Sequence, residues 1–225
     1  MATRSEARYV AIITDGNGRW AQRQGLPPLA GHEAGADVVK ARLRDAVTLG
    51  IEELTVYSFS TENWSRSPEE VAGLMDMFGR RIEAETPELH AEGVRMRFIG
   101  RRTDPVPPEL VTRMEWAERT TRDNTRITLF VAFNYGGRAE IVDAARMFTG
   151  GTEEEFRAHL YAPDMNDPDL IIRTSGEQRI SNYLLWQAAY SEFVFREELW
   201  PDFSRDAFEQ SLEEFAARRR RFGGR

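Results

Sequence analysis

The stretch YVAIITDGNGRW, residues 9–20, decides how this chain folds. Its first five residues, 9–13, form an apolar run that predicts a buried strand. The run leads to Asp15, two glycines and Arg19, after which a helix can begin. Glycines let backbone N–H groups approach an anion closely, and a helix N-terminus adds about half a positive charge. This order of residues predicts a diphosphate-binding turn at the carboxyl end of a strand, although a DG-x-G sequence is often only a turn.

The length and composition are those of one globular domain. The chain has 225 residues, of which 41% are hydrophobic and 30% are charged. That is enough for a sizeable core, and no linker divides the sequence. We therefore expect a single domain over residues 1–225.

Charge and residue content exclude several classes of function. A formal net charge of −7 argues against general nucleic-acid binding, which needs a broad basic surface. The chain has no cysteine, so thiolate metal sites, disulfides and thiol catalysis are excluded. No stretch of about 18 apolar residues is present, and the N-terminal sequence lacks the apolar region of a signal peptide. These features predict a cytoplasmic protein without stable membrane insertion.

Strand-like and helix-like segments alternate along the chain. Apolar runs predict strands at 9–13, 54–59, 94–100, 126–133 and 169–174. Apolar spacing predicts helices at 31–50 and at 67–93, the second with Ser67 as N-cap and Pro68 in the first turn. Another helix begins near Ser204. The alternation predicts an α/β fold with a parallel sheet covered on both faces.

Polar residues follow four of the predicted strands. Ligands of parallel sheets bind beyond the carboxyl ends of the strands, so these loops are expected to meet at one mouth. The loops are residues 15–19, 60–66, 134–138 and 173–177.

Several side chains near this mouth have chemistry suited to diphosphates. Asp15 is an oxygen ligand suited to Mg²⁺ that bridges to phosphates, and Glu192 is a candidate second ligand or a structural carboxylate. Arg173 and Arg179, with Ser181, suit a second diphosphate. Ion pairing of the arginines with a carboxylate such as Glu177 explains their spacing equally well.

Two further sets of residues are open to two interpretations each. His32 lies at a helix start and either contacts phosphate or is a capping or surface residue. The aromatic residues near the mouth either shape an apolar tunnel or belong to the ordinary core. These aromatic residues are Trp20, Phe59, Trp64 and Phe133.

Four motifs together resemble the cis-prenyltransferases, the undecaprenyl diphosphate synthase-like family. They are DGNGRWA at 15–21, GHEAG at 31–35, FSTENWSRSPEEV at 59–71 and RTSGEQRISNYLLWQAAYSEFVF at 173–195. The resemblance extends over nearly the whole chain and includes the closing RRRRFGG.

The resemblance implies a homodimer of α/β subunits, each with about six mostly parallel strands, flanking helices and a hydrophobic tunnel. It implies Mg²⁺ as cofactor, bound by Asp15 with Glu192, and isoprenoid diphosphates as substrates. Asp15 and Asn63 are then the catalytic residues, and the RRFGG segment reaches toward the partner's acceptor site. The implied donor and acceptor residues are Gly16, Asn17, Gly18, Arg19 and Arg66 for the donor diphosphate, Arg173, Arg179 and Ser181 for the acceptor, and Trp20, His32, Ser60, Thr61, Glu62 and Trp64 around them.

The activity implied by the resemblance is condensation of an allylic diphosphate with isopentenyl diphosphate, which releases diphosphate. The allylic substrate is dimethylallyl, geranyl or farnesyl diphosphate. Phe133 adds bulk and the segment 146–168 is short, so a short isoprenoid product is expected.

Two departures from the family pattern keep other functions open. Pro28 stands where the family usually has an arginine that clamps the donor, and Thr14 stands where it commonly has methionine. One alternative is irregular head-to-middle coupling of two allylic diphosphates, as in the lavandulyl-type synthases of this fold. A weaker alternative is a non-catalytic partner subunit, although Asp15 and Glu192 are both retained.

Overall fold

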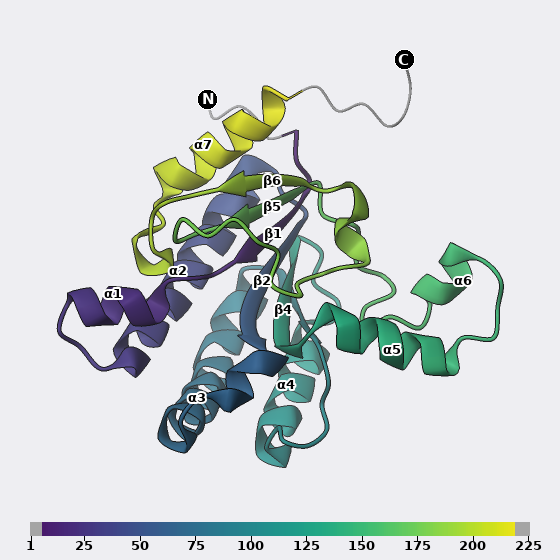
Figure 1. Cartoon of the computed structure of the whole chain (residues 1–225), viewed down its shortest axis with the longest axis horizontal. Coiled ribbons are helices and arrows are strands. Elements are labelled where there is room, and N and C mark those ends of the chain that lie inside the picture. The colour runs from purple at the N-terminus through teal and green to yellow at the C-terminus, as the bar shows by residue number, and fades with distance from the viewer. Residues whose placement is uncertain (1–5, 219–225) are drawn as a thin grey trace.

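One six-stranded sheet organises the part of the chain that the structure, a computed structural model, describes, residues 6–218. All of its strand pairs are parallel, in the order β3-β4-β2-β1-β5-β6 (Figure 1). The strands are β1 Tyr9–Ile13, β2 Glu53–Ser60, β3 Val94–Ile99, β4 Ile127–Tyr135, β5 Leu170–Arg173 and β6 Glu192–Phe195. The predicted α/β fold with about six parallel strands is confirmed.

The helices begin close to the predicted positions. Ser67 accepts a hydrogen bond from the Glu70 backbone N–H at 3.2 Å, and Ser204 caps the last helix in the same way. The α-helices are α1 Asn17–Arg23, α2 Pro28–Leu49, α3 Pro68–Ala91, α4 Pro108–Thr121, α5 Gly137–Met147, α6 Glu153–Arg157 and α7 Arg205–Ala216. Short 3₁₀ turns are η1 Thr61–Ser65, η2 Gln187–Tyr190 and η3 Trp200–Asp202. No helix of the described chain is both long and apolar enough to cross a bilayer.

Alternate residues of the central strand serve two different cores. Val10 and Ile12 of β1 are buried in the larger cluster, which includes residues of α2, α3, α4 and α7. Ala11 and Ile13 are buried in a second cluster on the other face, with residues of the segment 162–188. Because side chains alternate along a strand, a wholly apolar β1 is what a doubly covered sheet requires.

The order of the strands fixes where a ligand can bind. β1 lies between β2 and β5, and the chain returns from β4 to the opposite side of β1 to form β5. Such a reversal leaves a crevice beyond the carboxyl ends of the two strands. The loops after β1 and β5 therefore face each other across this crevice.

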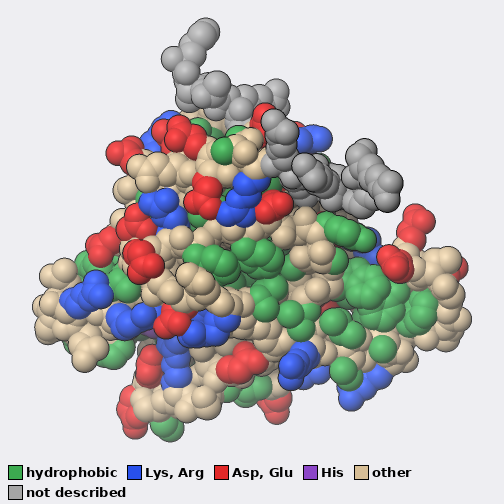
Figure 2. All heavy atoms as spheres, turned by 45° about the horizontal axis from the view of Figure 1, so that its top comes forward, with side chains coloured by type: hydrophobic (Ala, Val, Ile, Leu, Met, Phe, Trp, Pro, Cys, Tyr) green, Lys and Arg blue, Asp and Glu red, His purple; other side chains and the backbone are tan. Residues whose placement is uncertain are grey.

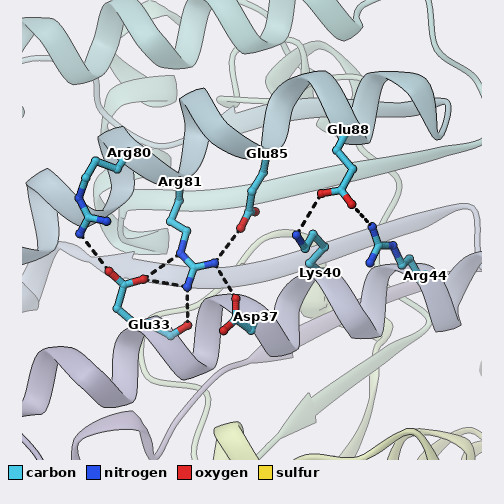
Figure 3. Close-up of polar contacts among 8 residues, drawn as sticks. All are labelled: Glu33, Asp37, Lys40, Arg44, Arg80, Arg81, Glu85 and Glu88. Atoms are coloured by element: carbon cyan, nitrogen blue, oxygen red, sulfur yellow. Dashed lines mark hydrogen bonds and ion pairs between the residues drawn. The ribbon is translucent and has the colours of Figure 1, made fainter.

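Ion pairs join α2 to α3 along a seam (Figure 3). The Arg81 guanidinium contacts Glu33 at 2.8 Å, Asp37 at 2.6 Å and Glu85 at 3.0 Å. Further along the seam, Lys40 contacts Glu88 at 3.0 Å. Arg81 is half-buried, so its pairs are screened less than those at the exposed end of the seam.

We predict that Arg81→Met lowers the free energy of unfolding by about 1–2 kcal/mol, because three pairs of about 0.2–1 kcal/mol each are lost. The change Lys40→Met removes one pair at a side chain of similar burial and should cost less, because fewer pairs are lost. Urea unfolding of both variants measures the difference, and 0.5 M NaCl should narrow it. Equal losses of unfolding free energy in the two variants would contradict the inference that Arg81 stabilises the seam more than Lys40 does.

Candidate active site

A cavity of about 790 Å³ opens at the carboxyl ends of β1, β2 and β5. It brings together most of the residues that the sequence placed at a mouth. Those that line it are Asp15, Gly16, Asn17, Gly18, Arg19, His32, Ser60, Glu62, Asn63, Arg66, Arg173, Arg179 and Ser181. Three of the four predicted loops therefore meet at one cavity.

The fourth loop, residues 134–138, does not line the cavity but contacts residues beside it. Trp64, expected to contact substrate, donates from Nε1 to the Asn134 Oδ1 at 2.8 Å and packs on Phe59. Trp20 likewise donates to Asp202 Oδ1, outside the cavity. Neither tryptophan lines the cavity, and Thr61 does not line it either. The structure places these three beside the cavity and not on its lining, because their side chains contact neighbouring residues, and their contact with substrate stays a prediction.

Glu192 lies at the other end of the sheet from Asp15. It begins β6, pairs in register with Leu170 and accepts a hydrogen bond from Arg218 at 2.9 Å. Leu170 is three residues, about 10 Å along the strand, before the end of β5 where the mouth opens. The expectation that Glu192 and Asp15 form one metal site is therefore wrong within a single chain. The RRFGG segment lies outside the described residues.

The glycine that follows Asp15 is required by its backbone and its surroundings. Gly16 caps α1 at φ 113°, in the left-handed region. A Cβ there would lie 2.9–3.1 Å from atoms of Leu199. The turn that brings backbone N–H groups to the mouth is thus specified by a glycine that no other residue replaces without strain.

The glycines of GHEAG let α1 pack closely on α2. A Cβ on Gly31 would lie 2.0 Å from the backbone oxygen of Asn17, and one on Gly35 would lie 2.3 Å from the Asn17 Oδ1. The Gly35 carbonyl also accepts a hydrogen bond from the Trp200 Nε1 at 2.8 Å. This motif positions the α1 end of the mouth and carries His32 into it.

Asp15 is the electrostatic centre of the cavity. Its carboxylate accepts from the Arg173 Nη2 at 2.9 Å and contacts the Arg19 Nη2 at 3.3 Å. Burial raises the pKa of Asp15, but hydrogen bonds from Arg173 and Ser175 and the charge of Arg19 outweigh it and hold the pKa below its usual value. Asp15 is therefore ionised at neutral pH.

Arg173 is buried, with 4% of its side chain exposed. Its Nη1 donates to the Ser181 Oγ at 2.7 Å and to the Arg179 carbonyl. Arg19 reaches the same loop, donating to the Ser175 Oγ at 2.6 Å. The loop after β5 therefore folds over the mouth and presents Arg179 and Ser181 beside Arg173.

His32 and Arg66 form the opposite wall. The Arg66 Nη1 lies 3.1 Å from the His32 Nε2 and donates to the Glu70 Oε1 at 2.9 Å. Burial and the Arg66 charge lower the pKa of His32 to about 4. His32 is thus neutral at physiological pH, with Nε2 as the acceptor for Arg66. The capping interpretation is excluded because Pro27, not His32, caps α2.

A narrower cavity of about 100 Å³ continues from the mouth between α2, α3 and the sheet. Thr14, Asn17, His32 and Ser58 line both cavities and form the neck between them. Beyond the neck the walls are mainly apolar, with Val39, Val56, Met77, Phe78, Ile82, Leu89, Met96, Phe98, Leu129 and Val131. The tunnel interpretation of the aromatic residues is wrong for Phe133, which stacks on Phe59 in the core.

Sequence reasoning missed several residues that line the mouth. Tyr57 and Ser58 end β2 on the cavity side, and Asn182 follows the predicted Ser181. Glu70 could have been predicted from the sequence, because it lies four residues after Arg66 at a helix start and pairs with it. Pro28, noted as a departure from the family pattern, does line the mouth.

Three carboxylates line the mouth, Asp15, Glu62 and Glu70, and the last two accept hydrogen bonds from Asn182 and Arg66. Among residues 6–218 no group of three or more His, Cys, Asp or Glu side chains is placed to hold a metal. Mg²⁺ is often bound by one or two carboxylates together with substrate phosphates and water. The donor set therefore fits a Mg²⁺ ion that binds with a diphosphate, and Asp15, which lies between Arg19 and Arg173, is the carboxylate that would hold it.

The chain is similar to known prenyltransferases over nearly its whole length. The family model Prenyltransf, described as undecaprenyl diphosphate synthase, matches residues 13–223. An isoprenyl transferase of Thermotoga maritima is 49% identical over 226 residues, covering 96% of this chain and 97% of the relative. A trans,polycis-polyprenyl diphosphate synthase of Thermobifida fusca, specific for (2Z,6E)-farnesyl diphosphate, is 48% identical over 96% of this chain and 80% of its own length.

A solved structure has nearly the same fold. It is lavandulyl diphosphate synthase from Lavandula x intermedia in complex with dimethylallyl diphosphate. It superposes with a TM-score of 0.91 at 33% sequence identity and covers 96% of this chain and 98% of that one.

Gly31→Ala should lower the free energy of unfolding by about 1–3 kcal/mol, because the added methyl meets the Asn17 backbone and α1 must move. Gly151→Ala is the control, since a Cβ there meets nothing within 4 Å. Urea unfolding measures both. A stable Gly31→Ala variant would show that the α1–α2 contact is looser than described.

His32 should make stability depend on pH. Its folded pKa of about 4 lies below the ordinary 6.5, so the unfolded chain binds a proton first as the pH falls from 6.5 toward 4, and stability is lost over that range. We expect the stability difference between wild type and His32→Gln to shrink by about 2–3 kcal/mol from pH 7.5 to pH 4.5. Urea midpoints at the two pH values test this, and a constant difference would contradict it.

Proposed function

The chain belongs to the undecaprenyl diphosphate synthase family of prenyltransferases, and from that membership we propose a Mg²⁺-dependent condensation. The allylic donor is dimethylallyl, geranyl or farnesyl diphosphate, and the acceptor is isopentenyl diphosphate. The products are a short isoprenoid diphosphate and free diphosphate.

One observation carries this proposal: two groups of cations meet around Asp15 at a mouth that continues into an apolar cavity. Arg19 and the turn after β1 form one group, and Arg173 with Arg179 forms the other. Each group suits a diphosphate, because guanidinium and backbone N–H groups are strong donors to phosphate oxygens. The apolar cavity suits the hydrocarbon tail of the donor. Its small size supports a short product.

The chain's own residues would lower the barrier chiefly by stabilising charge. As the allylic C1–O bond breaks, Arg19, Arg66 and N–H groups of the turn at Gly16–Gly18 stabilise the charge that builds on the departing diphosphate. The acceptor double bond then attacks the allylic C1 to form the new C–C bond, and an oxygen of the departing diphosphate takes one proton from the coupled cation to restore an alkene. Mg²⁺ bound at Asp15 with the diphosphate supplies Lewis-acid neutralisation of the leaving group.

The other mouth residues would orient the two substrates. The Asn63 Oδ1 accepts from the Ser60 backbone N–H at 3.0 Å, which commits the amide oxygen and leaves its N–H donors for a ligand. His32 holds Arg66 by accepting from it. Arg173, Arg179 and Ser181 would hold the acceptor diphosphate. Positioning of the two reactants adds to charge stabilisation, because it makes their coupling effectively unimolecular.

A homodimer forms part of the proposal. On the face shown in Figure 2, hydrophobic side chains form a band across the middle and toward α5 and α6, while charged residues of both signs are mixed elsewhere. The exposed large hydrophobic residues include Val142, Met147, Tyr190 and Phe195. Apolar patches of this kind mark contact surfaces.

Head-to-middle coupling of two allylic diphosphates is the second candidate. Pro28 lines the mouth, so the missing arginine would have been within reach of a substrate. Proline supplies neither charge nor N–H, which weakens one donor contact. The structural likeness to lavandulyl diphosphate synthase favours the same candidate.

Mass spectrometry of reaction products separates these functions. The purified chain is given Mg²⁺ and dimethylallyl or geranyl diphosphate, each with and without isopentenyl diphosphate. We expect a linear product that appears only with isopentenyl diphosphate. A branched product from allylic diphosphate alone would establish head-to-middle coupling, and no turnover with any pair would favour a non-catalytic partner subunit.

Asp15→Asn should reduce kcat about a hundred- to a thousandfold, because the carboxylate that would hold Mg²⁺ at the leaving group is lost. Asp76→Asn is the control, since Asp76 is exposed on α3, where it pairs with Arg80 away from the mouth. Product formation is measured per folded protein, because Asp15 also pairs with the buried Arg173. Near-normal turnover of the Asp15 variant at saturating Mg²⁺ would remove Asp15 from its role.

A further inference from the structure

One side chain joins two of the loops that meet at the mouth. The donor loop is residues 60–66 after β2, and the acceptor loop is residues 174–184 after β5. Asn182 of the acceptor loop donates from Nδ2 to the Glu62 Oε1 of the donor loop at 2.9 Å. These two residues lie 120 positions apart in the sequence. Both line the cavity.

Asn182 is also anchored to the start of α5. Its Oδ1 accepts from the Arg138 backbone N–H at 2.8 Å, and its carbonyl accepts from the Gly137 N–H at 2.7 Å. The acceptor loop is therefore tied by the backbone and the side chain of one residue to a helix that is part of the fold. The NYGGR segment, which does not line the mouth, gains a function as this anchor.

The backbone conformation at position 182 and the space beside it both suit an asparagine. Asn182 has φ 62°, in the left-handed region that asparagine tolerates better than most residues. A Cβ on Gly136 would lie 2.8 Å from the Asn182 Nδ2 and 2.7 Å from the Thr61 Oγ1. Gly136 thus leaves the space in which both loops approach α5.

The residues that would bind the acceptor depend on the same stretch of backbone. Ser181 directly precedes Asn182, and its Oγ accepts from the Arg173 Nη1 at 2.7 Å. The Arg179 carbonyl accepts from the same nitrogen. A shift of Asn182 therefore moves Ser181 and Arg179 relative to the donor loop.

We propose that Asn182 is a positioning residue for prenyl transfer, whose amide fixes the spacing between the donor loop and the acceptor loop. The proposal rests on the proposed function, because spacing matters only if two substrates react in this mouth. A small misplacement of two bound reactants is enough to slow their reaction about a hundredfold.

The Glu62 carboxylate is ionised at neutral pH. The bond between Glu62 and Asn182 can therefore be tested by exchanging its donor and its acceptor. Burial raises the pKa of Glu62, but hydrogen bonds from Asn182, from the backbone and from nearby hydroxyls outweigh it, so its pKa lies below the usual value. Asn182→Asp keeps the oxygen that accepts from Arg138 and tolerates the same φ, but it sets a carboxylate against Glu62. Adding Glu62→Gln to the same chain provides an amide donor to the carboxylate introduced at position 182, which restores the bond with its direction reversed.

The experiment measures kcat and KM of wild type, N182D, E62Q and the double variant with both substrates, beside thermal unfolding. We expect N182D to lower kcat roughly ten- to a hundredfold at saturating substrates, by loss of a hydrogen bond to a charged group. The double variant should recover most of that loss, with kcat well above that of N182D, whereas E62Q alone keeps an oxygen that accepts from Asn182. If Asn182 only stabilised the fold, N182D would lower the folded fraction and the midpoint of unfolding, and the double variant would not recover kcat.

Asn124→Asp is the matched control. Asn124 donates from Nδ2 to the Val94 carbonyl at 2.7 Å, between α4 and β3 and away from the mouth. The same replacement there should leave kcat unchanged.

Three results would overturn the proposal. An active wild type with an equally active N182D, or a double variant as slow as the two single changes combined, removes Asn182 from positioning while leaving the proposed function standing. A wild type inactive with every substrate pair overturns the proposed function, and the positioning role falls with it.

Discussion

The ion pair between Arg173 and Asp15 is the interaction on which the mouth depends. A guanidinium with 4% of its side chain exposed needs partners for its donors, and Asp15, Ser181 and the Arg179 carbonyl accept from its two Nη atoms, while the buried Nε has no hydrogen-bond partner among the described residues. Because Arg173 ends β5 and Asp15 follows β1, the pair closes the crevice where the strand order reverses. It fixes the acceptor loop onto the central strand and sets a carboxylate among arginines.

This arrangement accounts for chemistry on two anions. The turn after β1 and the loop after β5 present cations from opposite sides of Asp15, and the polar neck of Thr14, Asn17, His32 and Ser58 leads from them into an apolar cavity. A substrate with a diphosphate head and a hydrocarbon tail matches that division of polar and apolar walls. The glycines of GHEAG and NYGGR contribute by the space they leave, not by contact with a ligand.

Much of this was predictable from sequence, and what was not has physical causes. Apolar runs gave five strands, and Ser67 and Ser204 gave two helix starts, because these signals are local. Glu192 was misplaced because the four-residue β6 and its register with β5 depend on distant partners. Trp20 and Trp64 lie beside the cavity and not on its lining, because the direction of a side chain depends on what packs beside it. Asn182 was missed because its partner Glu62 lies in another loop.

The central claim is that one mouth binds two diphosphates at the same time. Calorimetric titration tests it most directly, with isopentenyl diphosphate added to the chain in Mg²⁺ and a saturating, unreactive thiolo analogue of an allylic diphosphate. We predict a ternary complex, in which isopentenyl diphosphate binds at one site per chain in the presence of the analogue. Binding of isopentenyl diphosphate only by displacement of the analogue would contradict it.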